Sequence, residues 1–148
     1  MIRYALVLGI LAAGVASAAP AGMPSGNYIG TATWHGVAGS SGTYAVETTI
    51  DGSRISTRYT WTDPKPRSET LTVTLSIKGT DPVFDVLDEA GKVIGKGYCY
   101  DQVCGYHIAY GSITLDETYR WSGSNLEVVG GKSGPGFSVA WREALTAK

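Results

Sequence analysis

Glu117 is the residue whose sequence surroundings are least usual for its chemistry. Alternate positions on either side of it carry large apolar side chains, Ile113, Leu115, Tyr119 and Trp121. A strand here would turn the Glu117 carboxyl toward an apolar interior, where a carboxylate without a partner is costly. The carboxyl therefore reaches solvent at a strand end, accepts a structural hydrogen bond from a tyrosine such as Tyr106, or contacts an amine or hydroxyl of a ligand.

Aromatic residues at inward positions could complete such a ligand site. Tyrosine and tryptophan combine a large apolar ring with a polar tip, which suits an aromatic, heterocyclic or amphipathic small molecule. The same rings could instead pack as core, and both interpretations stay open. The candidate ligand-binding residues are Glu117, Tyr106, Tyr119, Trp121, Trp34, Tyr44, Tyr59 and Trp61, with Tyr28, Tyr110 and Trp141 as further aromatic positions.

Other residues with catalytic or metal-binding chemistry are few. The two histidines, His35 and His107, occupy strand positions that alternate with the apolar ones and would point outward. Neither a shared metal site nor an acid–base pair is therefore indicated. No Gly-x-Ser-x-Gly, His-Glu-x-x-His or phosphate-loop motif occurs. The sequence therefore favours a non-catalytic protein, with no catalytic residue, metal or cofactor predicted. An isomerase or cyclase built on one carboxylate and tyrosines is the catalytic alternative.

The two cysteines are spaced for a disulfide across a hairpin. With Asp101 and Gln102 as a two-residue turn, Cys99 faces Cys104 in a non-hydrogen-bonded pair, whose Cα atoms approach to about 4.5 Å. A redox-active or metal-binding pair is disfavoured because the chain has no other cysteine and no adjacent histidine. We predict a disulfide between Cys99 and Cys104.

Apolar and polar residues alternate through almost all of the chain after residue 26. This period-two pattern predicts strands, and no long stretch has the i, i+3, i+4, i+7 spacing of an amphipathic helix. Sequential hairpins hide one apolar face by closing on themselves or by folding into a two-layer sandwich, and short connections favour closure. The predicted fold is all-β, an antiparallel up-and-down meander of about 8–10 strands closed into a barrel, with no significant helix in the mature chain.

Candidate turns place the apolar faces of successive strands on the same side. Two-residue turns at Asp51–Gly52, Ala90–Gly91 and Gly111–Ser112, and loops over 122–125 and 131–136, each preserve the inward set. Inward glycines either leave room for a ligand or are covered by neighbouring side chains. The expected cross-strand pairs include Ile50 with Ser53, Phe84 with Gly97, Tyr106 with Glu117, Gly130 with Glu117, and Val128 with Val139.

Residues 1–18 have the pattern of a secretory signal peptide. Arg3 precedes an apolar run over residues 5–16, and Ala16, Ser17 and Ala18 form a small-x-small cleavage pattern. The run is too short to cross roughly 30 Å of hydrocarbon, and no later segment is longer. We predict a signal peptide over 1–18, a flexible leader over 19–25 and a single β-barrel domain over 26–145, exported to the periplasm or the outside of the cell.

The opening and closing residues resemble a known superfamily. Gly26, Tyr28, Gly30 and Trp34, followed by a β-meander and a terminal Trp141-Arg142, are similar to the calycins, which include lipocalins, fatty-acid-binding proteins and avidins. The chain has Gly26-Asn27-Tyr28 where lipocalins have Gly-x-Trp, lacks their C-terminal helix, and has no room over 35–42 for the two helices of fatty-acid-binding proteins. The resemblance implies a barrel, and avidins are likewise helix-free and exported.

Two function hypotheses follow, and a formal net charge of −1 removes a third class. With 12 Lys and Arg against 13 Asp and Glu, the chain has no basic patch for nucleic acid. The first hypothesis is an exported, non-catalytic barrel that binds a small, partly apolar or aromatic ligand in its interior. The alternative is a secreted or periplasmic interaction or inhibitor barrel that binds a protein partner through the loops over 35–42, 63–67 and 131–136. No membrane span is expected in the mature chain.

Overall fold

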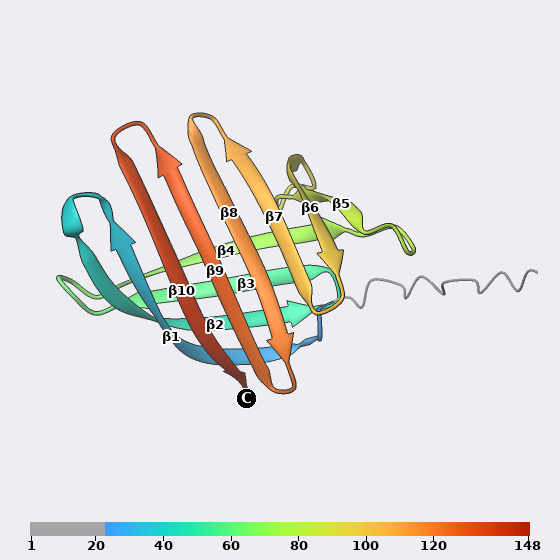
Figure 1. Ribbon diagram of the computed structural model, residues 1–148, viewed down its shortest axis with the longest axis horizontal. Helices are drawn as coiled ribbons and strands as arrows, with labels where there is room; N and C mark the ends of the chain where they lie inside the picture. The colour runs from blue at the N-terminus through green and yellow to red at the C-terminus, as the bar shows by residue number, and fades with distance from the viewer. Residues whose placement is uncertain (1–22) are drawn as a thin grey trace, which may run out of the picture.

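The computed structural model describes residues 23–148, in which ten antiparallel strands form a closed barrel (Figure 1). Each strand pairs with its neighbours in sequence, and β1 closes the barrel by pairing with β10. The all-β class, the up-and-down order and the closure are therefore confirmed. The elements are β1 (Gly26–Gly36), η1 (Val37–Gly39), β2 (Ser41–Asp51), β3 (Arg54–Trp61), β4 (Arg67–Ser76), β5 (Val83–Leu87), β6 (Val93–Tyr100), β7 (Val103–Tyr110), β8 (Ile113–Ser122), β9 (Asn125–Gly134) and β10 (Phe137–Ala147).

Helical structure among the described residues amounts to η1, a 3-10 turn of three residues. The described residues thus contain no helix longer than this turn, in agreement with the prediction of no significant helix. Over residues 23–148, no helix has both the length and the apolar character needed to span a membrane. The predictions for residues 1–18 and for the first part of the leader lie outside the described residues.

Most of the expected registers are present. Tyr106 pairs with Glu117, Gly130 with Glu117, and Phe84 with Gly97. Cys99 pairs with Cys104 across β6 and β7, and the two form the expected disulfide. These registers follow from side-chain parity because a slip of one residue would turn every apolar side chain of a strand outward.

Two expected registers are wrong, although in both cases the apolar side chains still point into the barrel. Gly52 and Ser53 form the first turn, so Ile50 pairs with Ile55 and not with Ser53. Gly52 has a φ of 58°, and glycine at the first central position is what a type II′ hairpin turn prefers. The shift is two residues, so the inward set survives.

The second wrong register is that between β9 and β10, because the glycine-rich stretch over 131–136 was expected to be a loop. β9 continues to Gly134, which pairs with Phe137, and Val128 pairs with Glu143 and not with Val139. The residues between the strands are 135 and 136, and Gly136 has a φ of 79°. A Cβ on Gly134 would lie 2.5 Å from the Phe137 ring, so glycine at this strand position leaves room for that ring. The loop expected over 35–42 is shorter, at 37–40, and the loop expected over 63–67 has the same length but lies one residue earlier, at 62–66.

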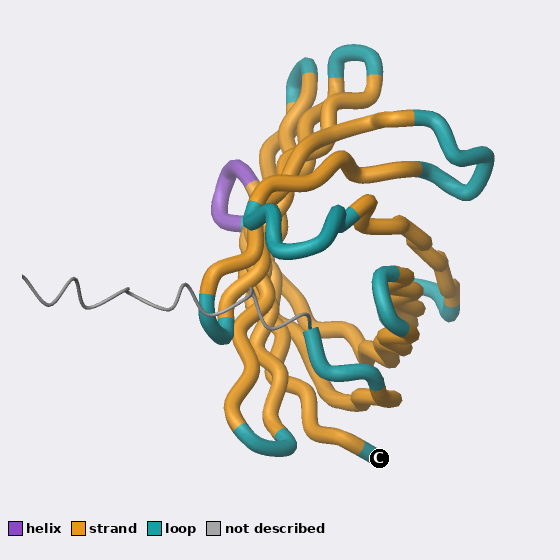
Figure 2. Tube along the Cα trace, turned by 90° about the vertical axis from the view of Figure 1, so that its right-hand side faces the viewer, coloured by secondary structure: helices purple, strands orange, loops and turns teal. Residues whose placement is uncertain are grey.

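Apolar side chains fill the barrel at the end where β1 begins, which we call the closed end. The strands curve around this shared interior (Figure 2). Fully burying one such aliphatic or aromatic side chain contributes about 1.5–3 kcal/mol, so this end carries much of the apolar stabilisation. Its buried residues include Met23, Tyr28, Ile50, Ile55, Val73, Leu75, Phe84, Val86, Trp121, Leu126 and Leu145.

Residues 23–25 contact the closed end, although the sequence placed them in a flexible leader. Met23 is 6% exposed and belongs to the core. The Pro24 carbonyl accepts a hydrogen bond from the Tyr28 hydroxyl at 3.1 Å, and Ser25 Oγ accepts one from the Gly52 N–H at 3.0 Å. The barrel therefore begins before residue 26, and it ends at Ala147, two residues beyond the expected limit of 145.

Candidate functional site

The other end of the barrel, which we call the open end, carries the loops over 37–40, 62–66, 88–92, 111–112 and 135–136. A continuous inward row crosses the barrel between this end and the core. Direct cross-strand pairs link its members in the order Gly42, Trp34, Trp141, Gly130, Glu117, Tyr106, Gly97 and Phe84. The row thus leads from two tryptophans at the open end, past the Glu117 carboxyl, to Phe84 in the core.

Glycines in this row provide room for rings. A Cβ on Gly130 would overlap the indole of Trp141, and a Cβ on Gly42 would lie 2.7 Å from Nε1 of Trp34. Gly97 is covered by Phe84 in the same way. Of the two roles considered for the inward glycines, these three therefore act as packing devices.

Glu117 lies at the centre of a buried tyrosine cluster. Its side chain accepts hydrogen bonds from the Tyr106 hydroxyl, from the Tyr119 hydroxyl at 2.8 Å and from the Tyr59 hydroxyl at 3.4 Å. Tyr106 and Tyr119 also contact each other through their hydroxyls at 3.1 Å. Of the three alternatives left open for Glu117, the structural hydrogen bond from Tyr106 is therefore present, and two further tyrosines join it.

A second buried carboxyl, Glu143, lies on β10 near this cluster. It is 1% exposed, and its Oε1 accepts a hydrogen bond from the Tyr44 hydroxyl at 3.2 Å. Burial, together with the negative charge of Glu117, raises the pKa of Glu143 to about 8, against the lowering effect of Tyr44. Glu143 therefore holds its proton at neutral pH.

The pKa of Glu117 is also raised, because burial outweighs the three tyrosine hydrogen bonds that favour the charged form. The pKa values of the neighbouring tyrosines are raised as well. Burial, and then the charge of Glu117, hold the pKa values of Tyr59, Tyr106 and Tyr119 well above the usual range. These three phenols remain neutral hydrogen-bond donors at any physiological pH.

Above the two carboxyls, the open end contains a cavity of about 420 Å³. Rings form much of its wall: Tyr44 and Tyr59 meet edge to face with centroids 5.7 Å apart, and Trp61 lies 5.3 Å from Tyr44. The lining residues are Trp34, Tyr44, Tyr59, Trp61, Arg67, Glu69, Thr70, Leu71, Leu115, Lys132, Val139 and Trp141. Glu117 and Glu143 are not among them, because the tyrosines lie between the carboxyls and the cavity.

A second cavity of about 530 Å³ adjoins the first. The two share Thr70, Leu71, Leu115 and Lys132, so they meet between β4, β8 and β9. The second cavity extends toward the β5–β6 loop, where Asp88 and Glu89 line it. The open end therefore offers space on both sides of Lys132.

One buried polar atom of the described residues lacks a hydrogen-bond partner, the indole Nε1 of Trp141. Buried N–H groups are nearly always paired, and an unpaired one costs about 1–3 kcal/mol. The atom lies over Gly130, the cross-strand partner of Glu117. The wall of the cavity thus holds a donor whose acceptor is not supplied by residues 23–148.

The eight residues that the sequence proposed as ligand contacts separate into three groups. Trp34, Tyr44, Tyr59 and Trp61 line the first cavity. Glu117, Tyr106 and Tyr119 lie beneath it in the hydrogen-bonded cluster, and Trp121, 8% exposed, packs in the core at the closed end.

Sequence reasoning missed four charged residues of the open end: Glu143, Arg67, Glu69 and Lys132. All four share the inward parity, since Glu143 pairs with Val128, Arg67 with Trp61, Glu69 with Tyr59 and Lys132 with Leu115. Extending the alternation beyond Trp141, and through the stretches expected as loops, would have found them.

The histidines lie away from this interior. His107 is exposed, and its Nδ1 lies 2.7 Å from Oδ1 of Asp116 on the outer face. Within residues 23–148, no cluster of three or more histidine, cysteine or acidic side chains is arranged to hold a metal.

Fold and site together define the chain as a ten-stranded antiparallel barrel with an aromatic cavity at one end. No protein-family model matches the sequence, and no curated protein matches it either. Among solved structures, the barrel is similar to the S-type phycobiliprotein lyase CPES from Guillardia theta, with a TM-score of 0.66 and 11% identity over 84% of this chain and 88% of that chain. At this identity the match shows a shared fold, and membership of the calycins stays a resemblance.

Proposed function

We propose that this protein binds a small, partly apolar or aromatic ligand in the first cavity of the open end. The observation that carries the proposal is the difference between the two ends of the barrel. The closed end is packed with apolar side chains, whereas the open end keeps about 420 Å³ lined largely by rings. That volume lies in the range of roughly 300–1,000 Å³ that small-molecule sites occupy.

The rings are held in place before a ligand arrives. The hydroxyls of Tyr44 and Tyr59 are bound by Glu143 and Glu117, so each ring is fixed at both ends, by its backbone and by its hydrogen bond. Rigid rings lose little conformational entropy on binding. A flat, apolar ligand that stacks against Tyr44, Tyr59 and Trp61 suits this wall best.

Binding is proposed in preference to catalysis because of where the carboxyls lie. Glu117 and Glu143 are the buried acids of the described interior, and both are separated from the cavity by tyrosine rings. A general acid or base must come within hydrogen-bond reach of the reacting atom. The structural neighbour is named a phycobiliprotein lyase. For this chain, the binding proposal is supported by the cavity at the open end of its barrel.

We also propose that the protein acts after export. The signal-peptide pattern over residues 1–18 supports this, and so does the Cys99–Cys104 disulfide, since disulfides persist in oxidising compartments. Intact mass analysis of protein from its own host would detect cleavage after Ala18. A mass that retains residues 1–18 would contradict export by this signal.

A neutral aromatic dye tests ligand binding directly. N-phenyl-1-naphthylamine should bind the wild-type barrel saturably, with increased dye fluorescence. Trp61→Ala should weaken binding by about tenfold, because it removes one wall ring. Tyr100→Ala is the matched control, since Tyr100 is 77% exposed on the outer face and lines neither cavity. Absence of saturable binding, or equal affinity in the Trp61→Ala variant, would contradict the proposal.

A further inference from the structure

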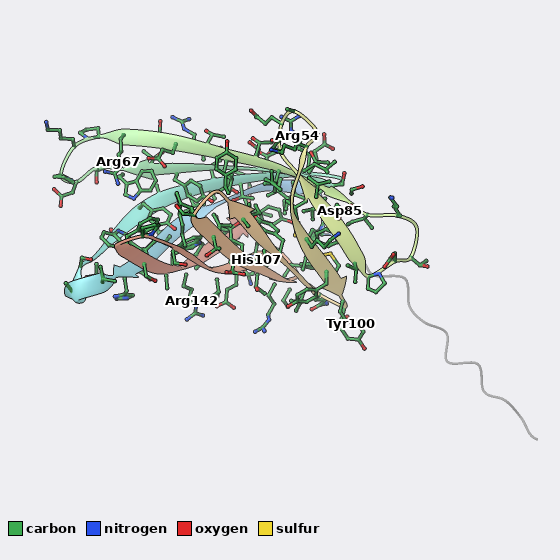
Figure 3. All side chains as sticks on the ribbon, turned by 90° about the horizontal axis from the view of Figure 1, so that it is seen from above. Arg54, Arg67, Asp85, Tyr100, His107 and Arg142 are labelled. Atoms are coloured by element: carbon green, nitrogen blue, oxygen red, sulfur yellow. A yellow bond between two sulfur atoms is a disulfide. The ribbon has the colours of Figure 1, made fainter. Side chains whose placement is uncertain are left out.

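Three charged residues occupy inward positions at the rim of the first cavity. Arg67 pairs across the strands with Trp61, Glu69 with Tyr59, and Lys132 with Leu115, and each of these partners lines the cavity. Figure 3 shows Arg67 at the open end, far from Tyr100 at the closed end. Charges on inward positions are uncommon in a barrel of this size, whose interior elsewhere is apolar or hydrogen-bonded.

The two cations of this rim have no carboxylate partner among the described residues. Four basic side chains of the barrel lie within 4.0 Å of an acid, Lys96 of Asp85, Arg142 of Glu127, Lys148 of Glu47 and Arg54 of Glu89, whereas Arg67 and Lys132, like the remaining lysines and arginines of 23–148, do not. Arg67 instead lies over the Trp61 ring, with its guanidinium carbon 4.6 Å from the ring centroid. The ring positions the guanidinium and leaves its N–H donors free for an acceptor.

Neighbouring acids do not neutralise this rim directly. Glu69 lines the same cavity but lies more than 4.0 Å from either cation within residues 23–148. In the second cavity, Asp88 accepts hydrogen bonds from the N–H groups of Ala90 and Lys92, and Glu89 faces Arg54. Arg67 and Lys132 therefore remain available to a bound anion.

The floor of the cavity has the opposite electrostatic character. Glu117 and Glu143 lie beneath Tyr44 and Tyr59, and the hydroxyls of both tyrosines already donate to these carboxyls. A ligand anion placed at the floor would meet two acids and no free donor from these tyrosines. The same anion at the rim would meet two cations, so the charge pattern orients a ligand with its acidic group outward.

We infer that the ligand is an amphipathic anion: an aromatic or apolar body between the rings of the first cavity, with a carboxylate, sulfonate or similar acidic group held at the rim by Arg67 and Lys132. This inference rests on the proposed function and narrows it to a chemical class. Charge-assisted hydrogen bonds from a guanidinium and an ammonium supply affinity for the acidic group.

Two dyes with nearly the same aromatic body separate the two contributions. 8-Anilinonaphthalene-1-sulfonate carries a sulfonate, and N-phenyl-1-naphthylamine lacks it. We expect the sulfonate dye to bind more tightly, and Lys132→Gln and Arg67→Gln each to weaken it by about fivefold or more, while the neutral dye changes less than about twofold. Added salt should weaken the sulfonate dye alone, because charges at an exposed rim are screened.

Lys65→Gln is the matched control, since it removes one positive charge from the β3–β4 loop at a residue that lines neither cavity. A sulfonate dye that binds no more tightly than the neutral dye, or that loses as much affinity in Lys65→Gln as in Lys132→Gln, would overturn the inference. If the neutral dye still binds and its affinity still depends on Trp61, the proposed function stands without the inference of an acidic group. If neither dye binds saturably, the proposed function fails and the inference fails with it.

Discussion

Glu117 and Glu143 are two buried acids with unequal surroundings. Glu117 accepts hydrogen bonds from three tyrosines, whereas Glu143 accepts one, from Tyr44. Hydrogen bonds to a carboxylate favour its charged form, so the negative charge is better stabilised on Glu117. The proton is correspondingly retained on Glu143, whose pKa rises to about 8. Of the two buried acids beneath the cavity, Glu143 is therefore the one that holds its proton at neutral pH.

This arrangement makes stability depend on pH in a defined direction. The folded-state pKa of Glu143, about 8, lies above its ordinary value of 4.5, so the folded protein keeps a proton that the unfolded chain releases between these values. The contribution to the free energy of unfolding is complete below pH 4.5 and is lost as the pH rises toward 8, by at most about 1.4 kcal/mol per pH unit.

Glu143→Gln should reduce this pH dependence, because glutamine can still accept the Tyr44 hydrogen bond but does not ionise. Urea unfolding of both proteins at several pH values from 5 to 9 would measure the slopes. Glu89→Gln at the exposed β5–β6 loop serves as the control and should keep the wild-type slope. An unchanged slope in Glu143→Gln would mean that this carboxyl is not the buried, protonated acid described above.

Strand β9 shows how an element that looks like a loop can serve as a wall of the barrel. Its glycines, Gly130, Gly131 and Gly134, differ in what they face. A Cβ on Gly130 would overlap Trp141, and one on Gly134 would lie 2.5 Å from the Phe137 ring, whereas one on Gly131 would meet only the Val139 carbonyl oxygen, at 3.6 Å. Gly130 and Gly134 therefore allow rings on β10 to lie flat against their neighbouring strand.

Gly130→Ala should displace the Trp141 ring and destabilise the barrel by about 1–3 kcal/mol, the usual cost of overpacking. Gly131→Ala, one residue along the same strand, should change the free energy of unfolding little. Urea unfolding measures both, and near-ultraviolet circular dichroism reports the tryptophan environment. Equal stability of the two variants would show that the indole is not seated on Gly130.

The elements also show which features the sequence could predict. Parity was sufficient to pair Tyr106 with Glu117 and to join Cys99 to Cys104, because one face had to be buried. The ends of strands were harder to predict, since the glycines of β9 lack a side chain and their role depends on rings from β10. Lys132 was missed for that reason, and Glu143 was missed because the alternation was not followed beyond Trp141. The cavity itself depends on ring orientations, which alternation does not specify.

The whole barrel is asymmetric along its axis. The closed end combines the apolar core, residues 23–25 and the disulfide, whereas the open end combines the cavity and the charged rim. Stability and proposed binding are therefore located at opposite ends. A protein partner bound through the open-end loops stays a prediction of the sequence, and the contacts described above concern the interior.

The disulfide should matter moderately for stability. Cys99 and Cys104 are five positions apart in the sequence, and closing so short a loop contributes about 2 kcal/mol in the chain-entropy account. Reduction should lower the midpoint of urea unfolding, with the circular dichroism spectrum of the barrel retained. Intact mass, with a gain of two hydrogens, would verify reduction. A reduced protein that no longer folds would show that the closed end depends on the bond and not on its core.

The indole N–H signals of the four tryptophans provide the most direct test of ligand binding at the open end. Trp34, Trp61 and Trp141 line the first cavity, and Trp121 lies in the closed-end core. In a two-dimensional ¹H–¹⁵N NMR titration with N-phenyl-1-naphthylamine, we predict that the first three indole signals shift along a saturating curve while that of Trp121 does not move. A titration in which the Trp121 signal moves as much as the others, or in which none of the four moves, would contradict binding in the open-end cavity.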